Sequence, residues 1–433
     1  MQHSIHPLLQ EITPSLNHEK LAMILSQQEN VLLIQDLDGV CMELVKDPLN
    51  RTINPDYVQA TKAFAGHFYV LTNGEHIGKR GVNGIIDRAF GDSHFVRENA
   101  LYLPGLAAGG VQWQDRRGNI AHPGVTEQEL TFLAQIPQRI KRQLEEFFTQ
   151  HSTSLSATEI ESGIEASILD NVASPTANLN TLYEALQNQP QVYLALQQTM
   201  RHLMETLLQE AEEQGLAESF FVHYAPNLGR DETGKEILRP VQDTDSGTTD
   251  FQFMLRGAIK EAGVLYLLNH YYYQRTGNYP LGKHFSVRHA PADYSQLRQL
   301  VHDSFDPDIM PIMVGVGDTV NSSVTYTNGK PEIRRGGSDR AFLQLIQDIH
   351  PQNLVVYIDS SGGEVKNRKA VEVETTPTGK QKVISGPCDP QDTTDPLQLD
   401  VIFPQGASQY TAFFRDVATR RLSVDALPLN QRL

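Results

Sequence analysis

The chain has 433 residues, enough to bury a large core and to form two or three structural units. Its formal net charge of −16, from 52 acidic and 36 basic residues, argues against nucleic acid or an anionic membrane surface as the main partner. The two cysteines, Cys41 and Cys388, exclude a disulfide framework or a thiolate zinc site and fit a reducing compartment.

No targeting or membrane segment is expected. The first residues, MQHSIHPLLQEITPSL, have no basic start followed by an apolar run of signal-peptide length. No stretch approaches the roughly 20 apolar residues of a membrane span. We therefore expect a cytoplasmic protein.

Buried strands are predicted at 31–35, 68–72, 311–317 and 353–359, where β-rich apolar runs end in turn signals. Helical patterns lie between or beside these runs, so the predicted fold class is α/β, with a Rossmann-like parallel sheet. More than 230 residues separate the second run from the third, far more than one crossover connection needs. An additional unit is therefore expected between them.

We place this inserted unit at residues 106–250 and the core at residues 1–105 and 251–433. Apolar residues recur at helical spacing in two segments of the insert, 126–150 and 191–215. Late in the core, residues 365–405 carry several prolines and few apolar runs, which indicates a surface excursion or a hairpin.

The first strand ends in QDLDGV, with two carboxylates, Asp36 and Asp38, one residue apart. At the carboxyl end of a parallel strand the chain turns, so both side chains can reach one pocket above the sheet edge. One carboxylate could attack phosphorus, and the other could exchange a proton with the leaving oxygen and with water. Two close carboxylates repel each other unless a cation lies between them, which predicts Mg²⁺. The alternative is a strand followed by an acidic turn.

Three other stretches could complete such a site. After the second strand, the hydroxyl of Thr72 and the backbone of Asn73 and Gly74 could hold a phosphoryl oxygen, although Asn-Gly is also a common hairpin turn. Asp318 ends the run IMVGVGD, which could also be an ordinary glycine turn. Lys260 lies in a predicted helix, where a lysine is usually a solvated surface residue.

The order of these stretches along the chain resembles the four motifs of the haloacid dehalogenase superfamily of phosphotransfer enzymes. The resemblance covers residues 25–110 and 250–365 and is most specific at DLDGV and VGVGD. It implies Mg²⁺ as cofactor and an inserted C2-type α+β cap domain. It also implies that Asp36 is the nucleophile and Asp38 the acid/base. Thr72 and Lys260 would bind the phosphate. Asp318, together with Asp36 and the carbonyl of Asp38, would bind the metal.

Two features depart from the superfamily pattern. The last motif continues as GDTVNSS without a second acid, which leaves Asn321 or Asp339 as the outer support of the metal. Lys260 lies 58 residues before Asp318, and Lys283 is closer. We prefer Lys260 because KEAGVLYLL resembles the lysine of the family, which is followed by small residues and a leucine-rich helix face.

Longer stretches, among them QDLDGVCMELVKDPLNR, FYVLTNGEHIGKRGVNG and FFVHYAPNLGRDETGKEI, resemble the cyanobacterial glucosylglycerol-phosphate phosphatases. This resemblance implies hydrolysis of 2-O-glucosyl-glycerol 3-phosphate to an osmoprotectant, the step after a glycosyltransferase, in the response to salt stress. Two alternatives remain: a phosphatase for sucrose phosphate or trehalose phosphate, or a catalytically weak relative that associates with the upstream synthase and regulates it.

A sugar or polyol substrate needs hydrogen-bonding partners. Polar residues after the second strand and in one loop of the insert are the candidates for substrate binding: Asn73, Gly74, Glu75, His76, Lys79, Arg80, His223, Asn227, Arg230 and Asp231. The segment GIEASILDNVASPTANLN is either another substrate-facing loop or the start of a helix capped by Asp170 or Asn171.

Overall fold

The structure is a computed structural model that describes residues 15–425, except residues 46–47, 233–234, 243–244, 328–329, 366–367 and 378–380. The chain divides into two compact units. The first contains the described residues of Met1–Asn73, Ile85–Pro123 and Ile259–Leu433, and the second contains those of Gly74–Gly84 and Gly124–Ala258.

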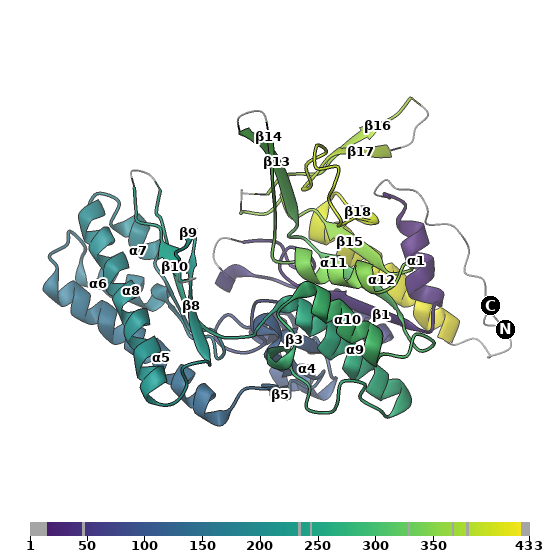
Figure 1. Cartoon of the computed structure of the whole chain (residues 1–433), viewed down its shortest axis with the longest axis horizontal. Helices are drawn as coiled ribbons and strands as arrows, with labels where there is room; N and C mark the ends of the chain where they lie inside the picture. The colour runs from purple at the N-terminus through teal and green to yellow at the C-terminus, as the bar shows by residue number, and fades with distance from the viewer. Residues whose placement is uncertain are drawn as a thin grey trace. The chain divides into compact units, whose positions relative to one another are not determined.

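The first unit is built on an eight-stranded sheet with the order β18-β15-β12-β1-β2-β3-β4-β5 (Figure 1). The strands from β18 to β3 are parallel, and β4 and β5 add an antiparallel edge. Their bounds are β1 Val31–Gln35, β2 Phe68–Leu71, β3 Gly105–Ala107, β4 Gln112–Gln114, β5 Ile120–Ala121, β12 Ile312–Gly317, β15 Leu354–Ile358 and β18 Val401–Phe403. The predicted parallel α/β core is therefore confirmed.

Helices cover both faces of this sheet. One group, α9 (Lys260–Thr276), α10 (Tyr294–Ser304) and α11 (Arg340–Ile349), packs together, with α9 and α11 against β1, β2, β3, β12 and β15. A second group, α1 (His18–Gln27), α2 (Pro55–Ala60) and α12 (Gly406–Asp425), packs around α12, which contacts β15 and β18. Strands β1 and β15 are buried from end to end and β12 is buried after its first residue, as expected for a parallel sheet between two helical layers.

The remaining elements of the first unit lie around the sheet. They include α4 (Ser93–Glu98), most of α3 (Val82–Phe90) and two hairpins, β13–β14 (Asn321–Thr327 and Lys330–Gly336) and β16–β17 (Glu372–Thr375 and Gln381–Ser385). The second hairpin falls in the segment 365–405, where an excursion or hairpin was expected. The same segment also supplies β18, an edge strand of the core that its sequence did not reveal because only three of its residues are apolar and consecutive.

The second unit contains a four-stranded antiparallel sheet in the order β6-β7-β11-β8. Two long helices pack on it, α5 (Glu127–Gln150) and α8 (Pro190–Glu213), as the spacing of their apolar residues predicts. The other elements are α6 Ala157–Ser167, α7 Asn180–Ala185, β6 Ile168–Leu169, β7 Thr176–Asn178, β8 Phe220–Ala225, β9 Asn227–Arg230, β10 Glu236–Leu238 and β11 Asp250–Leu255. Helix α5 starts at a capping box in which Thr126 and Glu129 bond each other's backbone N–H.

The boundaries of the two units differ from those expected at residues 106 and 250. Residues 106–123 belong to the first unit, because β4 and β5 pair onto the core sheet. Strand β11 belongs to the second unit, because it pairs with β7 and β8. Residues 74–84, expected in the core, also belong to the second unit. Strand pairing sets the boundaries at β4, β5 and β11, and hydrogen bonds from Glu75, Lys79 and Arg80 join residues 74–84 to the second unit.

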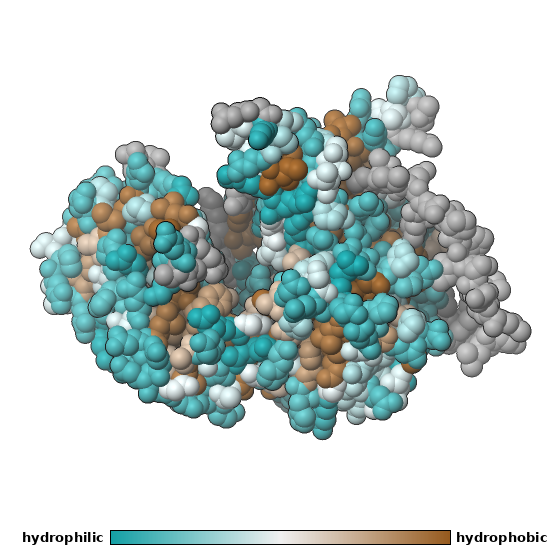
Figure 2. All heavy atoms as spheres, in the orientation of Figure 1, coloured by the Kyte–Doolittle hydropathy of each residue, from teal (hydrophilic) through white to brown (hydrophobic). Residues whose placement is uncertain are grey.

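On the face shown in Figure 2, hydrophilic side chains predominate and hydrophobic ones form separate patches. Among the described residues, none of the helices has the length and apolar character needed to cross a membrane.

Candidate active site

Three neighbouring strands of the core end in polar residues at the same edge of the sheet. Asp36 follows β1, Thr72 follows β2 and Asp318 follows β12, and β1 lies between the other two strands. The carboxyl ends of parallel strands meet at one edge, where open α/β sheets bind ligands. The residues that were far apart in the sequence are therefore brought to one place by strand order.

A tight turn after Asp36 brings the first and last motifs together. The N–H of Asp36 donates to the carbonyl of Val316, and the N–H of Leu37 donates to Oδ1 of Asp36. Gly39 has a φ of +76°, and a Cβ atom there would lie 2.1 Å from Oδ2 of Asp318. Only glycine fits this position, because it tolerates positive φ and leaves room for the aspartate.

Lys260, the first residue of α9, joins the motifs through two buried ion pairs. Its Nζ lies 2.9 Å from Oδ2 of Asp36 and 2.6 Å from Oδ1 of Asp339. Lys283, the alternative lysine, is exposed. The geometry therefore favours Lys260 as the lysine of this site.

Asp339 precedes α11 and is fully buried. Its Oδ2 accepts hydrogen bonds from the N–H groups of Asp318 and Thr319, at 2.9 and 3.0 Å. Asn321, the alternative support, is exposed at the start of β13 and pairs with Gly336. Of the two candidates, Asp339 is the one that contacts the rest of the cluster.

The carboxylates of Asp36, Asp318 and Asp339 fit a divalent cation. Each offers one oxygen, and these oxygens lie within 4.8 Å of one another. Oδ2 of Asp318 is buried and has no hydrogen-bond partner among the described residues. A hard cation that prefers oxygen ligands, such as Mg²⁺, would bind this oxygen. It would also reduce the repulsion among the three carboxylates, which Lys260 alone does not neutralise.

Burial dominates the electrostatics of the cluster. It raises the pKa of Asp36 to about 6, although Lys260 opposes the shift. Burial and then the charge of Asp36 raise the pKa of Asp318. Burial alone would lower the pKa of Lys260, but Asp339 and Asp36 raise it above its usual value. Lys260 is therefore a permanent positive charge. A second cation bound by the carboxylates would favour their ionised forms.

Asp38 has different surroundings. It is half-buried, and its Oδ1 lies 3.1 Å from Nε of Arg51, a residue to which the sequence assigned no role. Burial raises the pKa of Asp38, and Arg51 opposes this shift. Its carboxylate is not one of the three described carboxylates whose oxygens lie close enough together to share a cation.

The expected phosphate ligands after β2, Thr72, Asn73 and Gly74, do not all belong to the same unit. Thr72 is buried and its N–H donates to the carbonyl of Leu106, whereas Asn73 is exposed and is the last residue of its segment in the first unit. Gly74 begins the segment that belongs to the second unit. The structure thus places Thr72 at the sheet edge beside Asp36.

The candidates that follow bond within the second unit. The carboxylate of Glu75 accepts from the N–H groups of Val172, Ala173 and Ser174, at 2.8 to 3.1 Å. His76 is fully buried, Lys79 bonds Asp170 through its backbone N–H, and Arg80 donates to the carbonyls of Ala166 and Ile168. The expectation of a helix starting at Asp170 or Asn171 is wrong, because α6 ends before them and a loop there wraps around Glu75.

A second cluster of candidates gathers around one glutamate. Glu236 accepts from Nδ1 of His223, from the N–H of Tyr224 and from Nδ2 of Asn227. Asp231 caps a turn by accepting from the N–H of Lys235. The side chain of Arg230 lies outside the described part of the structure. These contacts give His223 and Asn227 a structural role that their position in a polar loop did not reveal.

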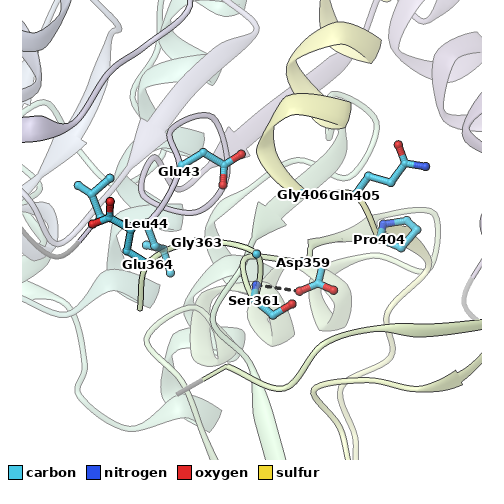
Figure 3. A pocket seen from close by; sticks show the side chains of 11 residues that line it. Glu43, Leu44, Asp359, Ser361, Gly363, Glu364, Pro404, Gln405 and Gly406 are labelled. Carbon is cyan, nitrogen blue, oxygen red and sulfur yellow. Dashed lines mark hydrogen bonds between the residues drawn. The ribbon is translucent and has the colours of Figure 1, made fainter. Parts of the chain in front are cut away.

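A cavity of about 810 Å³ opens at the carboxyl ends of β15 and β18 (Figure 3). It is lined by residues 43–45, 359, 361–364 and 404–406, and its described lining contains three carboxylates, Glu43, Asp359 and Glu364, but no cation. Asp359 is turned towards the backbone and accepts from the N–H groups of Ser361 and Val371. These carboxylates would repel a phosphate, and the described lining has no counterpart of Lys260, the buried cation beside Asp36.

Comparison with known proteins shows to which family the chain belongs. Residues 30–418 match the family model of glucosylglycerol-phosphate phosphatase. A glucosylglycerol-phosphate phosphatase from Synechocystis sp. is 59% identical over 411 residues, which cover 94% of this chain and 97% of the relative.

Solved structures with a similar chain path are more distant. A trehalose-6-phosphate phosphatase from Aspergillus fumigatus is 10% identical, with a TM-score of 0.37, over 94% of this chain and 99% of that one. A putative HAD/COF-like hydrolase from Plasmodium vivax is 12% identical, with a TM-score of 0.34, over 93% and 99%. These values are too low to support a functional argument. The sequence matches are sufficient: this chain is a phosphatase that belongs to the glucosylglycerol-phosphate phosphatase family.

Proposed function

We propose that this enzyme hydrolyses 2-O-glucosyl-glycerol 3-phosphate to glucosylglycerol and phosphate, with Mg²⁺ as cofactor and through an aspartyl phosphate. The observation that carries the proposal is the buried cluster of Asp36, Lys260, Asp318 and Asp339 in a chain whose 59% identical relative bears the name of that activity. The product is an uncharged polyol glycoside, which suits accumulation as an osmoprotectant.

In the first step, Oδ of Asp36 forms a bond to phosphorus while the bond from phosphorus to the glycerol oxygen breaks. Asp38 gives its proton to that oxygen, so the leaving group departs as a neutral alcohol. Burial raises the pKa of Asp38, which keeps more of it protonated than an exposed aspartate. The fixed charge of Lys260 offsets charge on the phosphoryl group.

In the second step, water attacks phosphorus and gives a proton to Asp38, and the bond between phosphorus and Asp36 breaks. Both carboxylates return to their starting state. Asp36, Asp318 and Asp339 would hold Mg²⁺, which supplies positive charge against the oxygens of the phosphoryl group. Asp339 also fixes Lys260 and the backbone of Asp318, so the positions of the charged groups are set before the substrate binds.

The test is phosphate release from glucosylglycerol phosphate, sucrose phosphate, trehalose phosphate and glycerol phosphate, each with Mg²⁺ and with EDTA. We expect metal-dependent release with kcat/KM highest for the first compound. A preference for another compound would keep the chemistry and overturn the substrate. Release that is unaffected by EDTA would overturn the metal, and no release from any compound would favour a regulatory role with the upstream synthase.

A further inference from the structure

A buried glutamine lies directly before the nucleophile. Strand β1 reads VLLIQ, and all five residues are buried in a sheet between helices. Gln35 follows four apolar residues and, although its side chain is polar, it is as fully buried as they are. A buried amide is costly unless its groups are bonded, and an apolar residue of similar volume would avoid this cost. The hydrogen bonds of Gln35 therefore need an explanation.

Gln35 bonds two tyrosines and the nucleophile's own backbone. Its Oε1 accepts from the hydroxyl of Tyr57 in α2 and from the hydroxyl of Tyr410 in α12, both at 2.9 Å. Its Nε2 donates to the carbonyl of Asp36 at 3.1 Å. The carbonyl of Asp36 fixes which end of the amide is the nitrogen, because it can only accept and a flipped amide would place two oxygens against each other.

The two tyrosines are held as neutral donors. Burial raises the pKa of Tyr57 and of Tyr410 well above the usual value, so neither hydroxyl loses its proton in the ordinary pH range. Both rings also pack against Phe414, with centroid distances of 5.2 and 6.1 Å. The hydroxyls thus have fixed positions from which they orient Gln35.

We propose that Gln35, Tyr57 and Tyr410 form a positioning cluster that holds the peptide of Asp36 in place during phosphoryl transfer. The N–H of Asp36 is held by Val316 of β12, and its carbonyl is held by Gln35, so its peptide groups are bonded on both sides. A fixed backbone limits where the attacking oxygen can lie, and a misplacement of about 1 Å can cost roughly 10²-fold in rate. The proposal rests on Asp36 being the nucleophile, as set out above.

The cluster also gives a catalytic reason for the C-terminal helix. Tyr410 follows the start of α12, 374 residues after Asp36, and the described part of α12 otherwise packs on α1, α2 and the sheet. Through Tyr410 and Gln35, a helix that contributes no group to the carboxylate cluster acts on the nucleophile's backbone. Gln35, Tyr57 and Tyr410 are positioning residues, because none of these hydrogen bonds involves the carboxylate of Asp36.

The test compares Tyr57→Phe, Tyr410→Phe and the double variant with Tyr271→Phe as matched control. Tyr271 is equally buried, and its hydroxyl donates to Asn30 just before β1, at the end of the strand opposite to the site. We expect kcat of the double variant to fall about 10-fold with KM within about twofold of wild type, while Tyr271→Phe changes neither. Loss of transition-state geometry should also weaken inhibition by orthovanadate by a similar factor.

Gln35→Met keeps the side-chain volume and removes all three hydrogen bonds, so it should lower kcat at least as much. Urea denaturation of each variant separates folding from catalysis. Folded double and Gln35→Met variants with kcat and vanadate inhibition equal to those of Tyr271→Phe would overturn the positioning role. So would equal falls in Tyr271→Phe and the double variant, because they would show a general loss of stability.

The same variants are assayed with p-nitrophenyl phosphate, which separates this inference from the proposed substrate. A wild-type enzyme that hydrolyses only this small ester would overturn the substrate, and the variants would still decide the positioning role. A wild-type enzyme that hydrolyses neither compound would overturn both proposals.

Discussion

Asp36 and Asp38 are separated by one residue, yet their surroundings differ. Asp36 is buried and paired with Lys260, whereas Asp38 is half-buried and paired with Arg51. Two carboxylates with different environments can take different roles, one as a nucleophile and one as an acid and base. The strand end positions the first carboxylate, and the second lies in the turn that follows, beside Arg51.

Asp36→Asn tests the nucleophile. An amide oxygen is too weak a nucleophile to attack phosphorus, so we expect turnover to fall by at least about 10³-fold. The measurement is phosphate release under single-turnover conditions, with Asp400→Asn as the control for the same chemical change far from the carboxyl ends of the strands. Turnover near the wild-type rate in Asp36→Asn would exclude Asp36 as the nucleophile.

Asp318→Asn tests the metal site without an activity assay. A ligand that binds only the folded state stabilises it by about 2.7 kcal/mol at 100 times its Kd, so Mg²⁺ should raise the melting temperature of the wild-type protein. Asn replaces one of the three carboxylates, and we expect most of this rise to disappear. An Mg²⁺-dependent rise of equal size in Asp318→Asn would contradict the assignment.

At the scale of elements, one carboxylate organises the loop between β6 and β7. Glu75 accepts from three consecutive backbone N–H groups and from the hydroxyl of Ser174. Glu75 lies only three residues after Thr72, so a short stretch of chain leads from the sheet edge to this loop. The sequence suggested sugar binding for Glu75, but these contacts use its carboxylate to order a loop.

Glu75→Gln should therefore destabilise the protein. The amide puts an N–H group against backbone donors, which costs about 2–3 kcal/mol for a buried charge-assisted site. Urea denaturation measures the change, with Glu161→Gln on the exposed side of α6 as the control. Equal midpoints for the two variants would show that the loop does not depend on the Glu75 carboxylate.

Ionisation of Asp400, the residue before the edge strand β18, lowers the free energy of unfolding as pH rises. Asp400 accepts from the N–H of Val355 at 2.7 Å, and burial raises its pKa from 3.8 to about 6. The folded state favours the protonated form of Asp400. The loss of unfolding free energy is therefore absent below about pH 4, grows as pH rises, and is complete above about pH 6. The full difference corresponds to about 3 kcal/mol.

Asp400→Asn removes this ionisation. At pH 7.5 its unfolding free energy should exceed that of wild type by about 3 kcal/mol, because the amide does not ionise and so avoids the whole difference. At pH 4 the two proteins should be nearly equal. A gain that is the same at both pH values would show that ionisation of Asp400 is not its cause.

At the scale of the whole molecule, the formal charge of −16 is spread over two units. Like charges repel in the compact state, and salt shortens the range of this repulsion from about 30 Å at 0.01 M to about 8 Å at 0.15 M. The melting temperature should therefore rise by a few degrees over this range and then level off, equally with NaCl and KCl. A flat or falling melting temperature would contradict a stability limited by repulsion.

The sequence by itself determined the strands β1, β2, β12 and β15, because their apolar runs end in turn residues, and the polar residues that follow each strand. It also determined that a separate unit is inserted and where its long helices lie, because 3.6-residue periodicity is a local property. These features depend on neighbouring residues in the chain. The order of the motifs, which resembles that of the superfamily, allowed Asp36, Thr72, Lys260 and Asp318 to be named as one site.

Only the tertiary structure decided which residues surround them. The choice of Asp339 over Asn321, and the pairing of Arg51 with Asp38, depend on contacts between segments that have no local signal. The short strand β18 and the longer strand β11 were assigned by their partners rather than by their own composition. Gln35 looks like a polar break in an apolar strand until α2 and α12 bring two tyrosines to it. Long-range packing satisfies buried polar groups, so their roles follow from the fold and not from the pattern around them.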